Sequence, residues 1–358
     1  MPEPAPTFPV FASPKPSEPP QAVWVIKPRR TRWWLYILFF ALTLLSTTIV
    51  GAGMEYNFLR RQPVIALNDD AQSLFPIDWA LETPSHLLLG LPFSLTLMLI
   101  LFSHEMGHYL YARHYRVYAT PPFFVPFPSL IGTLGAFIRI KSPIPSRAAL
   151  FDIGIAGPIA GFIPACAALL VGLSLSHPLS AAAITAPNFA QFQLGLPMAF
   201  RLGAWLLQIH RPLAGMSLHP IAAAAWAGMF ATSLNLLPGG QLDGGHILYS
   251  LSPRLHRAIT WLTVLTLLPL GKYLWTGWFV WAVLLAITRH HPPVARRPEV
   301  QGRRRLVALS AVVMLVLSFA PTPITHSSGK DVWPELRDDV RDAVHGLRNE
   351  ARHLLHRK

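Results

Sequence analysis

The chain has 358 residues, of which 52% are hydrophobic and only 13% are charged. Because soluble domains carry about 25% charged residues, this composition excludes an ordinary soluble protein and indicates a membrane protein. The formal net charge of +13 does not indicate a nucleic-acid partner, since the basic residues gather at the ends of apolar segments, where they determine topology. The single cysteine, Cys166, excludes a disulfide within the chain and a cysteine-based zinc site.

The N-terminal residues 1–32 are rich in proline and lack the apolar stretch of a signal peptide. We expect a disordered cytoplasmic tail here, followed by an uncleaved anchor helix over 33–53. Because no transit peptide is recognisable, we expect the inner (cytoplasmic) membrane of a bacterium rather than a chloroplast.

Several apolar segments approach the length of about 20 residues that a membrane span needs. They cover 33–53, 87–111, 148–175, 221–237, 259–270, 273–288 and 306–320. Lys and Arg are frequent in alternate connections and scarce in 176–208, which places the N-terminus in the cytoplasm. The sequence therefore predicts an all-α polytopic membrane protein with about seven transmembrane helices, within a range of about six to eight.

The segment "SHEMGH" places ionisable side chains at the end of the second apolar helix. His104 and His108 are four residues apart, so they lie one turn apart on the same helix face, with Glu105 beside them. In this His-Glu-x-x-His arrangement the imidazoles bind zinc and the carboxylate is the general base that acts on water. The alternative is a pair of locally satisfied histidines; it is disfavoured because a charged group inside a membrane costs about 2.5–3.5 kcal/mol and is usually functional.

A catalytic zinc site usually has three protein ligands and a water molecule. Asp243 is the candidate for the third ligand, because it ends an apolar run and stands in the glycine-rich segment "LPGGQLDGGH". Glycine and proline break the helix there and allow the backbone to approach closely. Read alone, the segment leaves open the alternative of an aspartate in an interfacial turn, which the nearby pair His104 and His108 disfavours.

Two polar residues flank this segment. Asn235 is a candidate donor to an oxyanion or to a substrate backbone, and the alternative is an amide that packs between helices. His246 either reaches the site or lies at the membrane interface.

The stretch 132–140 combines β-type residues with glycines and has prolines on both sides, so it predicts a short re-entrant hairpin or strand. A free strand edge can capture an unwound substrate by β-addition. We therefore take the following residues as candidates for substrate binding: Gly132, Thr133, Leu134, Gly135 and Ala136. The alternative is an interfacial loop without a partner.

Together, these motifs resemble the intramembrane zinc metalloproteases of the site-2 protease family, peptidase family M50. "HEMGH" is similar to the HExGH helix of that family, and "NLLPGGQLDG" is similar to its second motif, NxxPxxxLDG. The segment between them resembles bacterial and plant-chloroplast homologues. No PDZ-like insertion is recognisable, because the connection 176–208 is too short for one.

The resemblance implies a catalytic membrane core over 86–290, with one Zn²⁺ per chain bound by His104, His108 and Asp243. It implies that Glu105 is the catalytic base and that the enzyme hydrolyses peptide bonds in or near the membrane-spanning segments of other proteins in the bilayer. The oligomeric state stays open.

Two other functions are compatible with parts of the sequence. A transporter also carries intramembrane His, Glu and Asp, for a proton or cation pathway, but it leaves Glu105 unexplained. A non-catalytic membrane adaptor of the same fold would be expected if Glu105 or Asp243 were replaced, but both residues are present, so this function is disfavoured. Beyond the core, we expect a C-terminal transmembrane helix over 304–321 and an amphipathic helix over 334–358.

Overall fold

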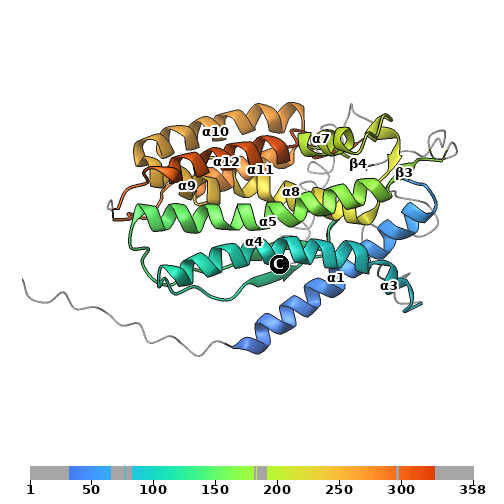
Figure 1. The fold of residues 1–358 in the computed structure, drawn as a ribbon, viewed down its shortest axis with the longest axis horizontal. Coiled ribbons are helices and arrows are strands. Elements are labelled where there is room, and N and C mark those ends of the chain that lie inside the picture. Colours follow the sequence, from blue (N-terminus) through green and yellow to red (C-terminus); the bar gives the residue numbers. More distant parts are fainter. Residues whose placement is uncertain are drawn as a thin grey trace, which may run out of the picture. The chain divides into compact units, whose positions relative to one another are not determined.

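A computed structural model of the protein describes residues 32–65, 77, 83–180, 183, 192–295 and 298–326. Within these ranges the chain is mostly helical, with three small two-stranded antiparallel sheets (Figure 1). Nearly all of the predicted N-terminal tail and the whole predicted amphipathic helix 334–358 lie outside the described residues.

The helices are α1 (Trp33–Leu59), α3 (His86–Leu89), α4 (Leu91–His114), α5 (Arg147–Leu175), α7 (Met198–Leu206), α8 (Pro220–Asn235), α9 (Asp243–Leu251), α10 (Pro253–Tyr273), α11 (Gly277–Ile287) and α12 (Arg303–Ser318). Strand β1 (Phe123–Pro126) pairs with β2 (Thr133–Phe137), β3 (His177–Pro178) with β5 (Met216–Ser217), and β4 (Phe192–Leu194) with β6 (Ile324–His326).

The mostly helical class is confirmed, but the count of about seven membrane spans is not. By length and apolar composition, two helices of the described part qualify as candidate spans, namely α1 and α5. The polar residues His104, Glu105 and His108 lower the hydropathy of α4, and α8, α11 and α12 are shorter than 18 residues.

Two short helices and two strand pairs were not expected. Helix α7 lies in the connection that was expected to be a plain loop, and α9 begins within the glycine-rich motif. The pairs β3–β5 and β4–β6 join segments far apart in the sequence, and their strands are too short to show an alternating pattern.

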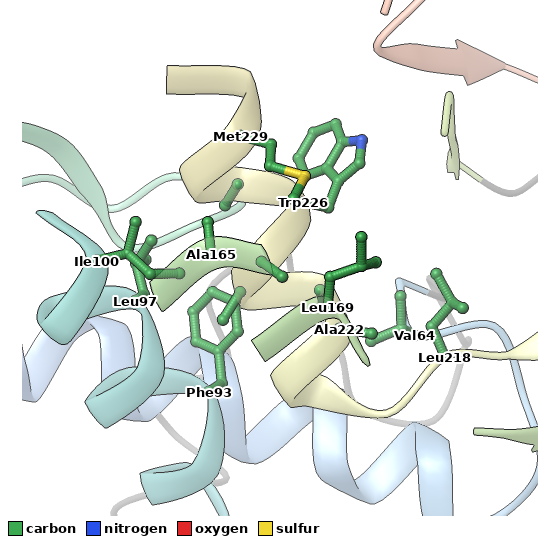
Figure 2. Close-up of a cluster of buried hydrophobic side chains, with 14 of the residues drawn as sticks. Val64, Phe93, Leu97, Ile100, Ala165, Leu169, Leu218, Ala222, Trp226 and Met229 are labelled. Carbon is green, nitrogen blue, oxygen red and sulfur yellow. The ribbon is translucent and has the colours of Figure 1, made fainter. Parts of the chain in front are cut away.

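The core forms where α4, α5 and α8 meet (Figure 2). Phe93 and Leu97 of α4 belong to one cluster of buried side chains with Leu169 of α5 and Met229 of α8. Small residues allow this approach: a Cβ atom on Gly172 would lie 2.2 Å from the backbone nitrogen of Ala222 in α8. Helices α5 and α8 therefore lie close together at this point.

A polar contact joins the ends of three helices. Arg304 of α12 binds the Asp152 carboxylate of α5 in a bidentate manner, with Nε 2.9 Å from Oδ1 and Nη2 2.8 Å from Oδ2. Tyr115, which follows α4 directly, donates its hydroxyl hydrogen to the same carboxylate. This contact ties α12 to the pair α4 and α5.

Candidate metal centre

Three predicted ligand residues lie together in the structure. His104 and His108 come from successive turns of α4, and Asp243 is the first residue of α9. Asp243 Oδ2 lies 3.2 Å from Nε2 of each histidine, and the two Nε2 atoms are 3.2 Å apart. Both histidines are less than 10% exposed.

The hydrogen-bond partners of these groups indicate what kind of ligand they suit. His108 Nδ1 lies 2.7 Å from the carbonyl oxygen of Ile153, which only accepts, so Nδ1 carries a hydrogen; in the neutral form of the ring, Nε2 then presents a lone pair. Asn235 Nδ2, a donor, lies 3.3 Å from His104 Nε2, which accordingly also presents a lone pair. Asp243 Oδ2 is buried and has no hydrogen-bond partner in the described part of the chain.

Three electron-pair donors that converge in a buried space repel one another unless a cation lies between them. Two imidazole nitrogens and one carboxylate oxygen form a donor set suited to zinc. The contact from His108 to the Ile153 carbonyl is the kind of outer bond that fixes the tautomer of a metal-binding histidine. The residues present therefore fit a zinc ion.

Glu105 lies beside this cluster without belonging to it. It is 6% exposed and lines a pocket of about 230 Å³ together with the three clustered residues, Asn235 and His246. The carboxylate is thus placed at the same cavity as the potential ligands, as a base would need to be.

Helix α5 provides the space for the cluster, which the sequence analysis missed. A Cβ atom on Gly157 would lie 2.1 Å from His108 Nε2, and one on Gly161 would lie 2.9 Å from His104 Cβ. A Cβ atom on Gly107 of α4 would lie 2.4 Å from the carbonyl oxygen of Ala156. The available signal was the spacing of glycines in "GIAGPIAGF", where Gly154, Gly157 and Gly161 share one helix face.

The turn between α8 and α9 brings Asp243 back to α4. Gly240 has a φ of 58°, a conformation that favours glycine. A Cβ atom on Gly244 would lie 2.2 Å from the carbonyl oxygen of Leu236, so the turn is packed against its own start. His256 of α10 supports it, because its Nε2 lies 2.9 Å from the carbonyl oxygen of Gly240.

The predicted strand is present and reaches the same pocket. Thr133, Leu134, Gly135 and Ala136 lie in β2, and Gly132 precedes it with a φ of 76°. Strand β2 pairs with β1, with Ala136 opposite Phe124. Ala136 lines the pocket that contains Glu105, whereas the Leu134 side chain is 67% exposed.

His246 also lines the pocket, and its partner was not foreseen. His246 Nδ1 lies 2.8 Å from His291 Nε2, and His291 Nδ1 lies 2.7 Å from the carbonyl oxygen of Pro292. His291 therefore donates to Pro292 and accepts from His246. Burial lowers the pKa of His291, and nearby His256 acts in the same direction, which favours the neutral ring that this arrangement requires.

Comparison with known proteins identifies similar sequences. The family model described as peptidase family M50 matches residues 92–268. The protein named "Probable zinc metalloprotease EGY1, chloroplastic" from Oryza sativa subsp. japonica is 30% identical over 323 residues, which cover 88% of this chain and 54% of that protein. Its namesake from Arabidopsis thaliana is 30% identical over 88% of this chain and 57% of its own length. "Probable zinc metalloprotease EGY2, chloroplastic" from Arabidopsis thaliana is 33% identical over 72% of this chain and 45% of its own length.

The chain spans about half the length of these curated relatives. They are chloroplastic proteins of plants, so the expectation of a bacterial inner membrane is wrong, and the comparison points to a chloroplast membrane. The expectation rested on residues 1–32, and the start of a chain that covers half of its relatives carries no information about a leader.

Proposed function

Because this chain belongs to peptidase family M50, we propose that it is a zinc metalloprotease that hydrolyses peptide bonds in or near the membrane-spanning segments of other proteins. The observation that supports this most strongly is the convergence of two histidine nitrogens and one aspartate oxygen at a buried pocket that Glu105 also lines.

Zinc is the cofactor that the relatives' names and the donor set imply. His104, His108 and Asp243 would hold one ion per chain. When bound, zinc polarises the scissile carbonyl group and makes a nucleophilic water available near neutral pH.

The remaining chemistry belongs to residues of the chain. Glu105 accepts the proton of the attacking water and returns it to the leaving amine. Asn235 supplies an amide hydrogen beside the cluster, where it can stabilise the developing oxyanion. The backbone of β2 holds an unwound substrate segment, because Ala136 lines the pocket and a strand edge binds an extended peptide through main-chain hydrogen bonds.

We also propose a membrane arrangement. In it, α4, α8, α10, α11 and α12 cross the membrane together with the candidate spans α1 and α5, and the basic ends of these helices lie on one common side of the membrane. The segment 33–53 then acts as an anchor, 86–290 as the catalytic membrane core and 304–321 as the last span.

The test separates the roles of base and ligand. Glu105→Gln should slow cleavage by about 10²- to 10⁴-fold, the range for loss of a general base, and should retain the zinc content of the wild type. Asp243→Ala and His104→Ala should lose both zinc and activity. Zinc content is measured by elemental analysis of the purified protein, and cleavage with a transmembrane model substrate.

A chelator-treated wild type that regains activity with zinc is the positive control. Full zinc occupancy in Asp243→Ala would refute the third ligand, and loss of zinc in Glu105→Gln would reassign Glu105 as a ligand.

A further inference from the structure

A second pocket, of about 480 Å³, lies where α9 ends and where α5, α10 and α12 begin. Arginine side chains line it from three helices: Arg147 from α5, Arg254 from α10 and Arg305 from α12. None of its lining residues lines the pocket of the metal centre. The proposed proteolytic reaction does not use it.

The charges of the lining residues are unbalanced. Glu299 is the one acidic residue among them, against three arginines. Arginines that gather around one cavity repel one another, and an anion in the cavity removes this repulsion. Ser252 adds a hydroxyl group to the same wall; its oxygen accepts from the Leu255 amide, and its hydrogen can be donated to a ligand. The hydroxyl of Ser250 already donates to the carbonyl oxygen of Ile247.

The side chain of Arg147 has a buried donor that makes no hydrogen bond within the described residues. Its Nε is buried and donates to no acceptor in the described part of the chain. A buried donor of a charged group without a partner is costly, so such atoms usually have a partner in the working protein. An anion in the pocket would supply such an acceptor.

The N-termini of α5 and α12 differ in how many free N–H groups they offer to the pocket. The first amides of α5 are already used, because the nitrogen atoms of Arg147 and Ala148 donate to the carbonyl oxygens of Ala295 and Pro298. Helix α12, in contrast, begins after Gly302 without a side-chain cap. The Arg305 amide donates to the carbonyl oxygen of Gly302, so the N–H groups of Arg303 and Arg304 and the positive end of the helix dipole are what favour an anion here.

We propose that this pocket binds the phosphate group of an anionic ligand. Each planar guanidinium group can donate two parallel hydrogen bonds, so three of them offer more donors than one carboxylate can accept. A phosphate group has enough oxygen atoms to accept from several of them. A lipid headgroup and a free phosphate compound share this chemistry. The proposal does not depend on the proteolytic function, because its site and its readout are separate.

The test measures thermal unfolding of the full-length chain in an uncharged detergent with added inorganic phosphate at constant ionic strength. The variant is Arg254→Gln combined with Arg305→Gln, since both side chains are exposed and their loss leaves the core intact. The matched control is Arg257→Gln, which removes an exposed arginine of the same helix that does not line the pocket. We expect a saturable rise in Tm for the wild type and the control. In the double variant, the phosphate concentration that gives half of this rise should be more than about tenfold higher.

A second arm identifies the source of the phosphate. Wild type and double variant are compared in nanodiscs of phosphatidylcholine with and without phosphatidylglycerol. Stabilisation of the wild type by phosphatidylglycerol alone assigns the pocket to a lipid headgroup, and stabilisation by inorganic phosphate in detergent assigns it to a free phosphate compound. The proposal is overturned if neither probe stabilises the wild type more than the double variant, or if Arg257→Gln behaves like the double variant.

Discussion

Helices α4 and α5 pack against each other at the metal centre, yet they contribute to it in opposite ways. Helix α4 supplies ionisable side chains, namely His104, Glu105 and His108. Helix α5 supplies space, through Gly157 and Gly161, and one carbonyl oxygen, that of Ile153. A buried site therefore needs reactive side chains on one helix and glycines that leave room for them on the neighbouring helix. A search for motifs of reactive residues finds only the side chains.

Among the variants that test this comparison, the largest effect is expected from filling the space that α5 leaves. In Gly157→Ala the new methyl carbon would lie 2.1 Å from His108 Nε2, and the ring cannot turn away without breaking its bond to Ile153. We expect zinc affinity to fall by about 10- to 100-fold, as for loss of an outer contact of a ligand, with a matching loss of cleavage. Zinc titration against a competing chelator measures this.

Gly154→Ala is the matched control on the same helix. Its methyl carbon would lie 3.3 Å from His246 Cβ, a tight contact that a small shift relieves. Its zinc affinity should stay near that of the wild type. An unchanged affinity in Gly157→Ala would show that α5 is only a neighbour of the site.

A smaller effect is expected from β2, which contributes backbone rather than side chains or space. A proline at Leu134 or Ala136 removes one backbone donor. At the position that faces the substrate, cleavage should slow by about three- to tenfold, the equivalent of one hydrogen bond, while zinc content stays unchanged. Leu134→Ala retains the backbone donor and should cleave at nearly the wild-type rate.

The model substrate sharpens this prediction. A transmembrane helix that contains glycine or proline should be cut faster than a leucine-rich one, because less helix has to unwind. If both proline variants cleave normally, β2 does not hold the substrate.

The smallest effect is expected from the contact that joins α12 to the α4–α5 pair. Arg304→Gln removes the bidentate bond to Asp152, but the arginine is 40% exposed and the Tyr115 hydroxyl remains as a donor. We expect a loss of at most about 1 kcal/mol in the free energy of unfolding, measured as a small decrease in Tm. Arg303→Gln, the exposed neighbour, should leave Tm unchanged; an equal decrease would mean that the bond to Asp152 is not what matters.

Much of the helical architecture is predictable because a long apolar run indicates a helix without any information from distant parts of the chain. The run predicted over 148–175 corresponds to α5, and the run over 221–237 corresponds to α8 within two residues. The spacing of His104, Glu105 and His108 is also a local property, so their shared location could be predicted without knowledge of the tertiary structure.

The remainder depends on contacts between distant segments. Nothing near His291 in the sequence indicates that it accepts a bond from His246, and nothing near Arg304 indicates Asp152. The glycines of α5 were visible, but their partners on α4 depend on how the two helices are turned toward each other. Helix α9 is too short, and its glycine-rich start too irregular, for periodicity to reveal it.

The position of Asp243 has a consequence for biosynthesis. On the proposed ligand set, the first two ligands emerge from the ribosome with α4, whereas the third follows only after α5, α7 and α8. On the proposed function, a partly synthesised chain would carry its two histidines without a complete centre and would not cut neighbouring proteins. Activity would begin when α9 folds back against α4, and a metal ion held by these three residues would act as a cross-link between the late half of the protein and the early half.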